Sequence, residues 1–409
     1  MNTADQQRYA ESTRKVEDVT TKYRLPGIAE NILRNLHRVT ERPQHGVNFR
    51  GTVIVCGAGP SLTHSLPYLA AAAGRVPIIA VNTAAPALGK AGVPIDVLVS
   101  IECLDLSKHI RAAGKVGTIV LDLMANPAQW EAAKESGARI AWILEAATHT
   151  AALAYGLGIE PHQSGGFGGS AAMELARIGG ASEIILCGFD LGYPTGKAYA
   201  DGSGWGGLEM KREGDRLIFT GREDRDVTHT SGGVPALPRS RPYFDVPAWG
   251  GEGTIPAVIE LVYQRDWIAA WHRSVLRASG VRMVNSSIGG ANVPGVDDLA
   301  PSLTIPRASG QCWHAGQPAT REALDRVRQV LREEAMAAKV IAEHFTKPTP
   351  WPRQEAKAAP IQMCMALAAY EWMSLRDAAE AGTLSVSEAI AGQYRALEAA
   401  ADRLEALCS

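Results

Sequence analysis

The sequence predicts an α/β fold, a Rossmann-like doubly wound parallel sheet, with a helical bundle at the C-terminus. Short apolar runs rich in β-branched residues recur from Gly51 to about Asp190, and a helix-like stretch follows each run. Strands buried on both faces of a parallel sheet read as continuous apolar runs, and helices cover the two faces. Heptad-like apolar spacing after residue 318 predicts the bundle.

The expected core elements alternate between strand and helix. The strands are Thr52–Cys56, Pro77–Val81, Val97–Ile101, Thr118–Leu123, Arg139–Leu144 and Glu183–Cys187. The helices are Ser61–Ala73, Ala84–Ala91, Ser107–Ala113, Pro127–Glu135, Thr148–Tyr155 and Gly169–Ile178. Right-handed crossovers join successive parallel strands, so these elements predict a doubly wound sheet that binds ligands at the carboxyl ends of its strands.

Changes in composition and in the spacing of apolar residues along the chain predict three domains. Residues 1–50 form an N-terminal segment that is helical in part, residues 51–310 the nucleotide-binding catalytic domain, and residues 311–409 the C-terminal helical bundle. Residues 192–253 are rich in Gly, Pro, Arg and Asp and are too long for a passive connection. We expect them to form loops and a hairpin, Glu209–Thr220, that fold as a lid over the carboxyl edge of the sheet.

The remaining elements follow from periodicity and capping. A helix at Pro256–Ser279 and a strand at Val281–Asn285 are expected to complete the core. The last bundle helix opens with the capping box Ser385–Glu388. Apolar residues at helical spacing predict three bundle helices, around residues 324–345, 361–375 and 390–408.

Composition argues against several classes of protein. The net charge of −2 provides no overall basic field for nucleic acid. The N-terminus is polar, and no apolar stretch approaches the roughly 18 residues of a membrane span, so the cytoplasm is the expected location. The six cysteines show no C-x-x-C spacing and no cluster with histidine, which predicts no structural metal site and fits a reducing compartment.

The strongest local signal is a strand that ends in glycines before a helix begins. Gly57 and Gly59 let the backbone approach a phosphate, and Pro60 and Ser61 begin a helix whose N–H groups and dipole favour an anion. A dinucleotide turn would place a third glycine at Leu62, so NAD and FAD are not expected. The turn is therefore interpreted as a nucleotide-binding turn, with a tight turn without ligand as the alternative.

Further polar residues follow other strands at the same edge. Asn82 can bind a base or a sugar hydroxyl, or it can cap the next helix. Glu102 can be a general base, a metal ligand or an exposed strand end. Ser164, Gly165 and Gly166 form a second glycine-rich entry to a helix, suited to an anion or a ribose, with a flexible hinge as the alternative.

Candidate residues continue into the long insertion. Asp190 lies just past a buried strand and is a catalytic candidate. Tyr193 and Tyr199 follow it, and their phenols can donate to phosphate oxygens or can serve only in packing. His229 is a candidate mobile acid or base, although a lone loop histidine is more often merely solvated.

The motifs at residues 53–62, 164–170 and 186–200, in this order, resemble those of the motility accessory factor family. These are flagellin glycosyltransferases for nonulosonic acids such as pseudaminic acid, and their core belongs with the 6-hydroxymethylpterin diphosphokinase-like domains. The motifs are also similar to those of bacterial sialyltransferases that use CMP-sialic acid. The resemblance covers about residues 50–300 and includes Asn285–Ala291. It implies a CMP-nonulosonate donor and a protein acceptor such as flagellin.

The resemblance implies roles only where positions match. Gly57, Gly59, Pro60 and Ser61 match the sialyltransferase nucleotide turn, Asn82 an asparagine near the donor, Ser164 and Gly165 the second donor loop, and Tyr199 a tyrosine that holds the leaving phosphate. The sialyltransferase base, a histidine, would fall near Gly251–Thr254, where Glu252 stands instead. The base therefore stays open among Glu252, His229 and Glu102.

Three functions stay open from the sequence. The first is transfer of a nonulosonate such as pseudaminic, legionaminic or sialic acid to a Ser or Thr hydroxyl, with no obligatory cofactor or metal. The second is pyrophosphoryl transfer from ATP to a hydroxymethylpterin, with Mg²⁺ held by Glu102, Asp190 and Asp201. The third is a non-catalytic nucleotide-binding adaptor whose bundle docks a partner. The oligomeric state is not predicted.

Overall fold

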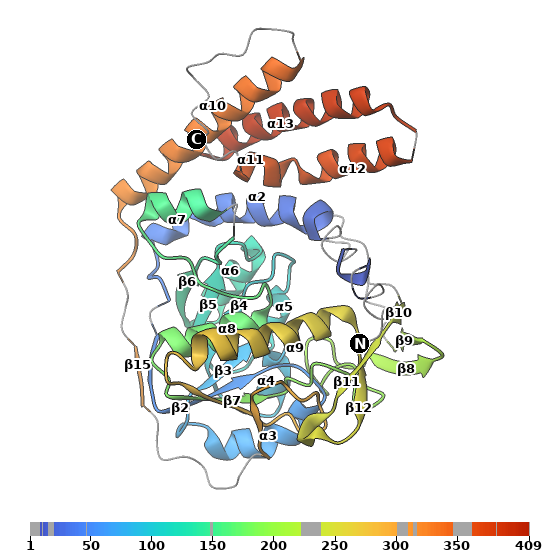
Figure 1. The fold of residues 1–409 in the computed structure, drawn as a ribbon. Helices are drawn as coiled ribbons and strands as arrows, with labels where there is room; N and C mark the ends of the chain where they lie inside the picture. Colours follow the sequence, from blue (N-terminus) through green and yellow to red (C-terminus); the bar gives the residue numbers. More distant parts are fainter. Residues whose placement is uncertain are drawn as a thin grey trace.

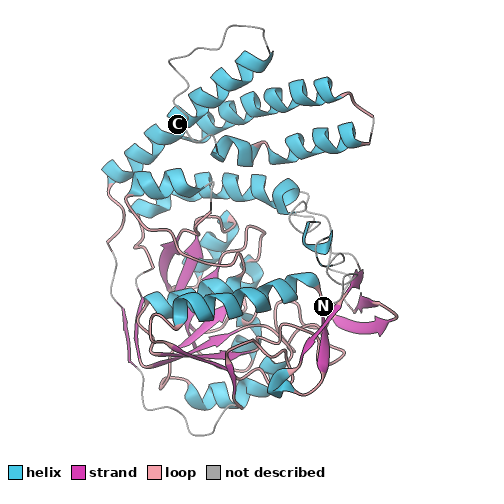
Figure 2. Ribbon diagram, viewed as in Figure 1, coloured by secondary structure: helices cyan, strands magenta, loops and turns pink. Residues whose placement is uncertain are grey.

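The computed structural model describes residues 9, 11–14, 20–45, 47–147, 150–221, 239–300, 310–313, 317–346, 362–381 and 383–408. Figure 1 shows an α/β core with a layer of helices stacked on one side of it. In Figure 2 the strands are confined to the core and its margin. Both ends of the chain contribute to the helical layer, because α2 (Leu25–Asn35) packs against the C-terminal helices.

The core is an eight-stranded parallel sheet in the order β14-β13-β7-β2-β3-β4-β5-β6. Its strands are β2 (Thr52–Cys56), β3 (Ile78–Val81), β4 (Ile95–Ser100), β5 (Val116–Asp122), β6 (Arg139–Ile143), β7 (Glu183–Cys187), β13 (Arg282–Asn285) and β14 (Asp297–Asp298). The expected strands are present, and the Rossmann-like fold class is confirmed. The strand order reverses at β2, which has β3 on one side and β7 on the other, and such sheets bind ligands at the carboxyl ends beside this point.

Helices flank the sheet, as the sequence predicts, although several ends differ (Figure 1). They are α3 (Ser61–Ala72), α4 (Ala85–Lys90), α5 (Ser107–Arg111), α6 (Pro127–Glu135), α7 (Ala151–Leu157), α8 (Gly168–Ile178) and α9 (Ile259–Trp271). The helix expected from Pro256 differs most. Pro256 lies in β12 (Thr254–Ala257), where it pairs with Asp245, so α9 begins three residues later.

The long insertion contains the hairpin that the sequence predicts. The hairpin consists of β8 (Glu209–Glu213) and β9 (Arg216–Thr220), and β10 (Ser240–Pro242) adds a third strand. A second hairpin pairs β11 (Phe244–Pro247) with β12. Leu217 and Phe219 of β9 are buried in an apolar cluster with Tyr193 and Val258, so the first hairpin packs on the segments that leave β7 and enter α9.

The helical layer contains α2 and the C-terminal helices. The latter are α10 (Arg321–Thr346), α11 (Gln362–Leu367), α12 (Ala369–Glu380) and α13 (Val386–Cys408). The second expected bundle helix is therefore split, because the chain turns at Ala368 between α11 and α12. The capping box before α13 is confirmed: Ser385 N–H donates to Glu388 Oε2 over 3.0 Å, and Glu388 N–H donates to Ser385 Oγ over 3.3 Å.

Two buried asparagines, one helical turn apart, attach α2 to the core. Asn31 Nδ2 donates to the carbonyls of Cys103 and Met124 over 3.0 and 3.1 Å. Asn35 Nδ2 donates to the carbonyls of Leu123 and Ala125 over 2.8 and 2.7 Å. These carbonyls lie just beyond the ends of β4 and β5, so the N-terminal segment helps to shape the carboxyl edge of the sheet.

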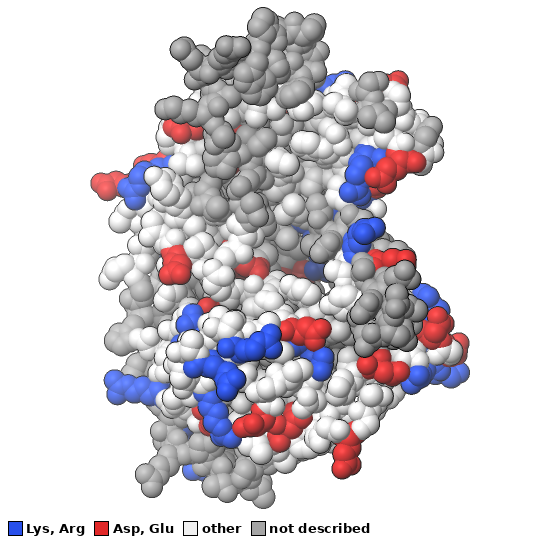
Figure 3. Space-filling view, in the orientation of Figure 1, with Lys and Arg blue, Asp and Glu red and all other residues white. Residues whose placement is uncertain are grey.

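Among the helices that the structure describes, none is long and apolar enough to cross a membrane. On the face of the molecule in Figure 3, basic and acidic side chains lie close to one another over the core. Ion pairs also occur at the surface of the core, for example between Arg282 and Glu183, whose Nη1 and Oε1 atoms are 2.6 Å apart. This mixed surface agrees with the near-neutral net charge.

Candidate functional site

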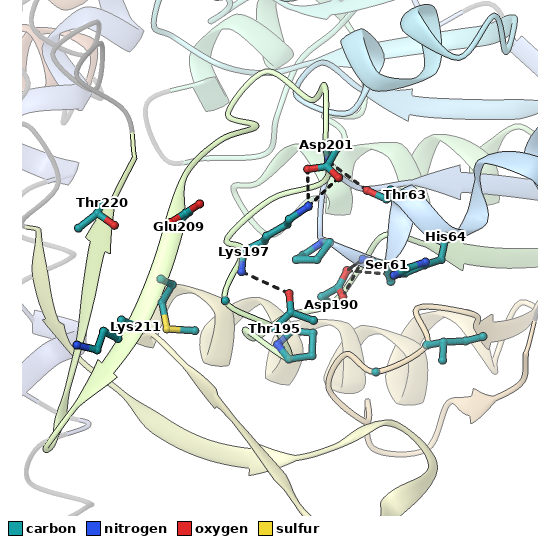
Figure 4. Close-up of a pocket in the computed structure, with 16 residues that line it drawn as sticks. Ser61, Thr63, His64, Asp190, Thr195, Lys197, Asp201, Glu209, Lys211 and Thr220 are labelled. Atoms are coloured by element: carbon teal, nitrogen blue, oxygen red, sulfur yellow. Dashed lines mark hydrogen bonds and ion pairs between the residues drawn. The ribbon is translucent and has the colours of Figure 1, made fainter.

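A pocket of about 630 Å³ lies beyond the carboxyl ends of β2 and β7 (Figure 4). The first turn of α3 forms one wall, and the loop of residues 194–197 with β8 forms the opposite wall. Asp190, three residues beyond the end of β7, lines the pocket together with Ser61 and His64 of α3. The site thus lies where the strand order reverses, the position expected for a ligand in a doubly wound sheet.

The glycine turn after β2 packs tightly against the turn after β7. A Cβ atom at Gly57 would lie 2.5 Å from the carbonyl oxygen of Gly188, and one at Gly59 would lie 2.0 Å from Oδ2 of Asp190. The N–H of Gly59 donates to the Gly188 carbonyl over 2.8 Å. The two glycines are therefore required by the close approach of two chain segments, whether or not a ligand binds there.

The Asp190 carboxylate lies at the N-terminus of α3. Both of its oxygens accept the Ser61 N–H, at 3.1 and 3.2 Å, and Oδ2 also accepts the Ser61 hydroxyl at 2.8 Å. Burial raises the pKa of Asp190 to about 7, although the bonds from Ser61 act in the opposite direction. Asp190 is 2% exposed. A carboxyl group of this pKa can both accept and donate a proton near neutral pH.

The position of Asp190 affects the expected phosphate site. A helix N-terminus attracts one anionic group, and in this structure that group is the Asp190 carboxylate. The N–H of Gly57 also has a protein partner, the Cys187 carbonyl at 2.8 Å. Binding of a nucleotide by Gly57, Gly59, Pro60 and Ser61 stays a prediction, and only the last two of these residues line the pocket.

Several residues that line the pocket are not among the candidates identified from the sequence. His64 follows Ser61 by three positions, which places both on one face of α3, and this helical spacing is a signal that finds it. Lys197 Nζ contacts both carboxylate oxygens of Asp201, at 2.8 and 2.7 Å, and both residues line the pocket. Lys211 lies on β8, and no local pattern connects that strand with the glycine turn.

The polar residues after β3 and β4 take part in a network of hydrogen bonds and do not line the pocket. Asn82 Nδ2 donates to Ser100 Oγ over 2.8 Å, and Ser100 Oγ donates to Gln129 Oε1 over 2.6 Å. No side chain caps α4, so the interpretation of Asn82 as a helix cap is wrong. Glu102 Oε1 lies 3.5 Å from Nη1 of Arg24, which comes from the N-terminal segment.

The second glycine-rich segment leads into α8. Ser164 Oγ donates to Glu145, a carboxylate after β6 that the sequence reasoning missed, and burial raises the pKa of Glu145. A Cβ atom at Gly165 would lie 2.6 Å from the Trp267 ring, so packing requires this glycine. Within the described residues, the structure gives no partner to the N–H groups of Gly168 and Gly169 in the first turn of α8. The N-terminus of α8 is therefore more open to an anion than the N-terminus of α3, which the Asp190 carboxylate occupies.

None of the other candidates that the structure describes lines the pocket. Tyr193 and Tyr199 pack in the apolar cluster beneath β9 and do not line the pocket. Glu252 is exposed in the turn between β11 and β12. His229 falls outside the described residues. Of the catalytic candidates Glu252, His229, Glu102 and Asp190, the structure places Asp190 in the pocket.

The described part of the chain contains no group of three or more His, Cys, Asp or Glu side chains that could hold a metal ion. The carboxylates considered as Mg²⁺ ligands each contact another side chain. Glu102 contacts Arg24, Asp190 contacts Ser61, and Asp201 contacts Lys197. Asp190 and Asp201 line the same pocket, whereas Glu102 does not.

The fold and the position of the pocket define the class of doubly wound α/β proteins that bind ligands beyond the carboxyl ends of their strands. Residues 30–196 match the family model of the MptE-like proteins, described as 6-hydroxymethylpterin diphosphokinase MptE-like. The match runs from α2 through β7 to the segment after Asp190. The resemblance of the sequence motifs to the 6-hydroxymethylpterin diphosphokinase-like domains is therefore confirmed.

A solved structure is similar in fold, the MAf glycosyltransferase from Magnetospirillum magneticum AMB-1. The TM-score is 0.55 at 13% sequence identity, and the likeness covers 93% of this chain and 58% of that protein. This chain thus corresponds to a little over half of the length of the larger glycosyltransferase. No curated protein matches the sequence.

Proposed function

We propose that this chain is a glycosyltransferase that moves a sugar from a nucleotide-activated donor to a hydroxyl group. The observation that carries the proposal is the pocket beyond the carboxyl ends of β2 and β7. The titratable side chains of His64 and Asp190 and the cationic side chain of Lys197 line this one space, which can hold a donor and an acceptor hydroxyl. The fold shared with the MAf glycosyltransferase supports the same reaction class.

The donor we propose is a CMP-nonulosonate such as pseudaminic, legionaminic or sialic acid, and the acceptor is a Ser or Thr hydroxyl of a protein such as flagellin. The acceptor oxygen attacks the anomeric carbon in the pocket, and the bond from that carbon to the phosphate oxygen breaks. Lys197 and Lys211 are the cationic side chains of the pocket that can meet the negative charge of the donor. Asn82, Ser164 and the start of α8 are proposed to contact the nucleotide.

Thermal denaturation with different nucleotides tests this proposal. Binding to the native state alone stabilises a protein by RT ln(1 + [L]/Kd), or roughly 2.7 kcal/mol at a ligand concentration of 100 Kd. We expect CMP or CDP to raise the melting temperature more than ATP, NAD or GDP at equal concentration. A preference for ATP with Mg²⁺ would instead favour the pyrophosphokinase activity, to which the description of the matching family points.

The same measurements separate an enzyme from a binding module. A protein that binds CMP and releases it from a CMP-sugar is a transferase or a hydrolase of the donor. Binding of CMP without turnover of any CMP-sugar, with and without protein acceptors, would favour the non-catalytic adaptor.

A further inference from the structure

We infer that His64 is the catalytic base that takes the proton from the attacking hydroxyl. The inference rests on the proposed glycosyl transfer and adds the proton acceptor, which neither the motifs nor the comparisons assign. It begins from the position of His64 in the pocket, in the first turn of α3 and beside the Ser61–Asp190 pair (Figure 4).

The helix gives the imidazole a defined place. Leu62 and Leu69 of α3 are fully buried, so the face of the helix that carries them is fixed against the core. Ser61 and His64 lie on the face toward the pocket, and His64 is exposed there. Within the described residues, the structure gives the His64 ring no hydrogen bond or ion pair, which leaves a ring nitrogen available to a substrate hydroxyl.

The other titratable groups of the pocket are less suited to this step. Both oxygens of Asp190 accept hydrogen bonds from Ser61, and the carboxyl is nearly completely buried. Both carboxylate oxygens of Asp201 accept from Lys197, in an ion pair that is exposed to solvent. On β8, Lys211 contacts Glu213 over 3.0 Å.

Glu209 is the remaining carboxylate of the pocket, and it stands on the opposite wall from α3. Histidine is the side chain used most often for general acid–base catalysis, because its neutral imidazole accepts a proton near neutral pH. The arrangement therefore assigns proton removal to His64, while the buried Asp190 provides a second titratable group close to it.

The step balances in atoms and electrons. The acceptor O–H bond breaks, and its proton passes to a ring nitrogen of His64. The acceptor oxygen forms a bond to the anomeric carbon as the bond between that carbon and the donor phosphate breaks, and the electron pair leaves with the nucleotide. The imidazolium then returns the proton to water. No oxidant, reductant or metal ion is consumed.

The test compares His64→Ala with His37→Ala, a change at another exposed histidine whose ring lies 3.9 Å from Glu41 and outside the pocket. The probe is release of CMP from CMP-N-acetylneuraminic acid, with water as acceptor. We expect His64→Ala to reduce turnover by about 10²–10⁴-fold while the Kd for CMP stays near that of the wild type. Added imidazole should restore part of the rate in His64→Ala only, and His37→Ala should behave as the wild type does.

Three results would overturn the inference. One is a His64→Ala rate equal to that of the wild type. Another is loss of CMP binding in parallel with loss of turnover and without rescue by imidazole, which would make His64 a binding residue. In the third, CMP binds but the wild-type protein releases none from the donor, so the proposed transfer fails and the role of His64 falls with it. The second result would contradict only the role of His64, whereas the third would contradict the proposed transfer itself. The activity of the wild-type protein distinguishes the two.

Discussion

Ser61 and Asp190, 129 positions apart in the sequence, are joined by three hydrogen-bond contacts at the start of α3. The contact connects the first βα turn of the sheet with the segment that follows β7. It explains the glycine at position 59, which leaves room for the carboxylate, and its hydrogen bonds oppose the burial that raises the pKa of Asp190. One contact therefore relates the tight packing of the turn to the chemistry of the pocket.

The first prediction concerns pH and stability. The pKa of Asp190 is raised from 3.8 to about 7 in the folded protein, so the folded state binds this proton more tightly than the unfolded state. The contribution of Asp190 to the free energy of unfolding is fully present below about pH 4 and is lost as the pH rises through about 7. The loss amounts to roughly 2–4 kcal/mol. Asp190→Asn cannot ionise and should not show this loss.

Urea denaturation of both proteins between pH 4 and 8.5 measures the effect. Other carboxyls with raised pKa, such as Glu145 and Glu334, are common to both proteins and cancel in the difference. Parallel stability curves over the whole range would contradict the assigned pKa of Asp190.

The second prediction tests the close packing of the glycine turn. In Gly59→Ala the new methyl group would overlap Asp190 Oδ2 and lie 2.8 Å from the Gly188 carbonyl oxygen, so backbone must shift. We expect a loss of about 1–3 kcal/mol in the free energy of unfolding. Gly27→Ala is the control, because a Cβ atom there meets nothing within 4 Å in α2, and alanine favours a helix. If both variants are equally stable, the turn is looser than the structure indicates.

Gly59 and Asp190 also show which parts of the site can be predicted from the sequence. The apolar run of β2 and the glycines after it are local signals, and they predict the strand, the turn and the helix that follows. Asp190 is recognised as a candidate because it lies just past a second apolar run. That Asp190 rather than a phosphate occupies the start of α3 depends on the pairing of β2 with β7, a contact between segments far apart in the sequence.

The pocket is even harder to predict from local sequence patterns, because it is formed by segments that are distant in the sequence. One wall comes from α3 and the other from β8, and the spacing of apolar residues in each segment carries no information about the other. His64 is detectable by its helical spacing from Ser61 once the helix is predicted. Lys197 and Lys211 are not, because their positions depend on how an insertion without periodicity folds back over the edge of the sheet.

The third prediction concerns the attachment of the helical layer. Asn35 is completely buried, and its Nδ2 satisfies the carbonyls of Leu123 and Ala125. Asn35→Ala leaves both carbonyls without this donor, and an unsatisfied buried acceptor costs about 1–3 kcal/mol. We expect a loss of about 2–4 kcal/mol, measured by chemical denaturation. Asn48→Ala, at an exposed position in β1 (Val47–Arg50), should change stability by less than about 0.5 kcal/mol.

A smaller effect of Asn35→Ala would have a specific meaning. It would show that water or a rearranged Asn31 replaces the lost donor, since Asn31 lies one turn away on α2 and already contacts Cys103 and Met124. The double variant, Asn31→Ala with Asn35→Ala, distinguishes these cases. If Asn31 compensates, the loss in the double variant will exceed the sum of the two single losses.

The last prediction separates glycosyl transfer from pyrophosphoryl transfer by their need for a metal ion. A CMP-sugar carries a single phosphate, whose charge Lys197 and Lys211 can meet, whereas transfer from ATP requires Mg²⁺ to neutralise a triphosphate. We expect release of CMP from a CMP-nonulosonate to survive EDTA, and the double change Lys197→Met with Lys211→Met to slow it by roughly 10²–10³-fold. Lys115→Met, a change outside the pocket, should leave the rate unchanged. Loss of CMP release in EDTA that Mg²⁺ restores, together with full activity of the double lysine variant, would contradict metal-independent transfer. Asp190 and Asp201, which line the pocket, would then be the carboxylates to test as ligands of the ion.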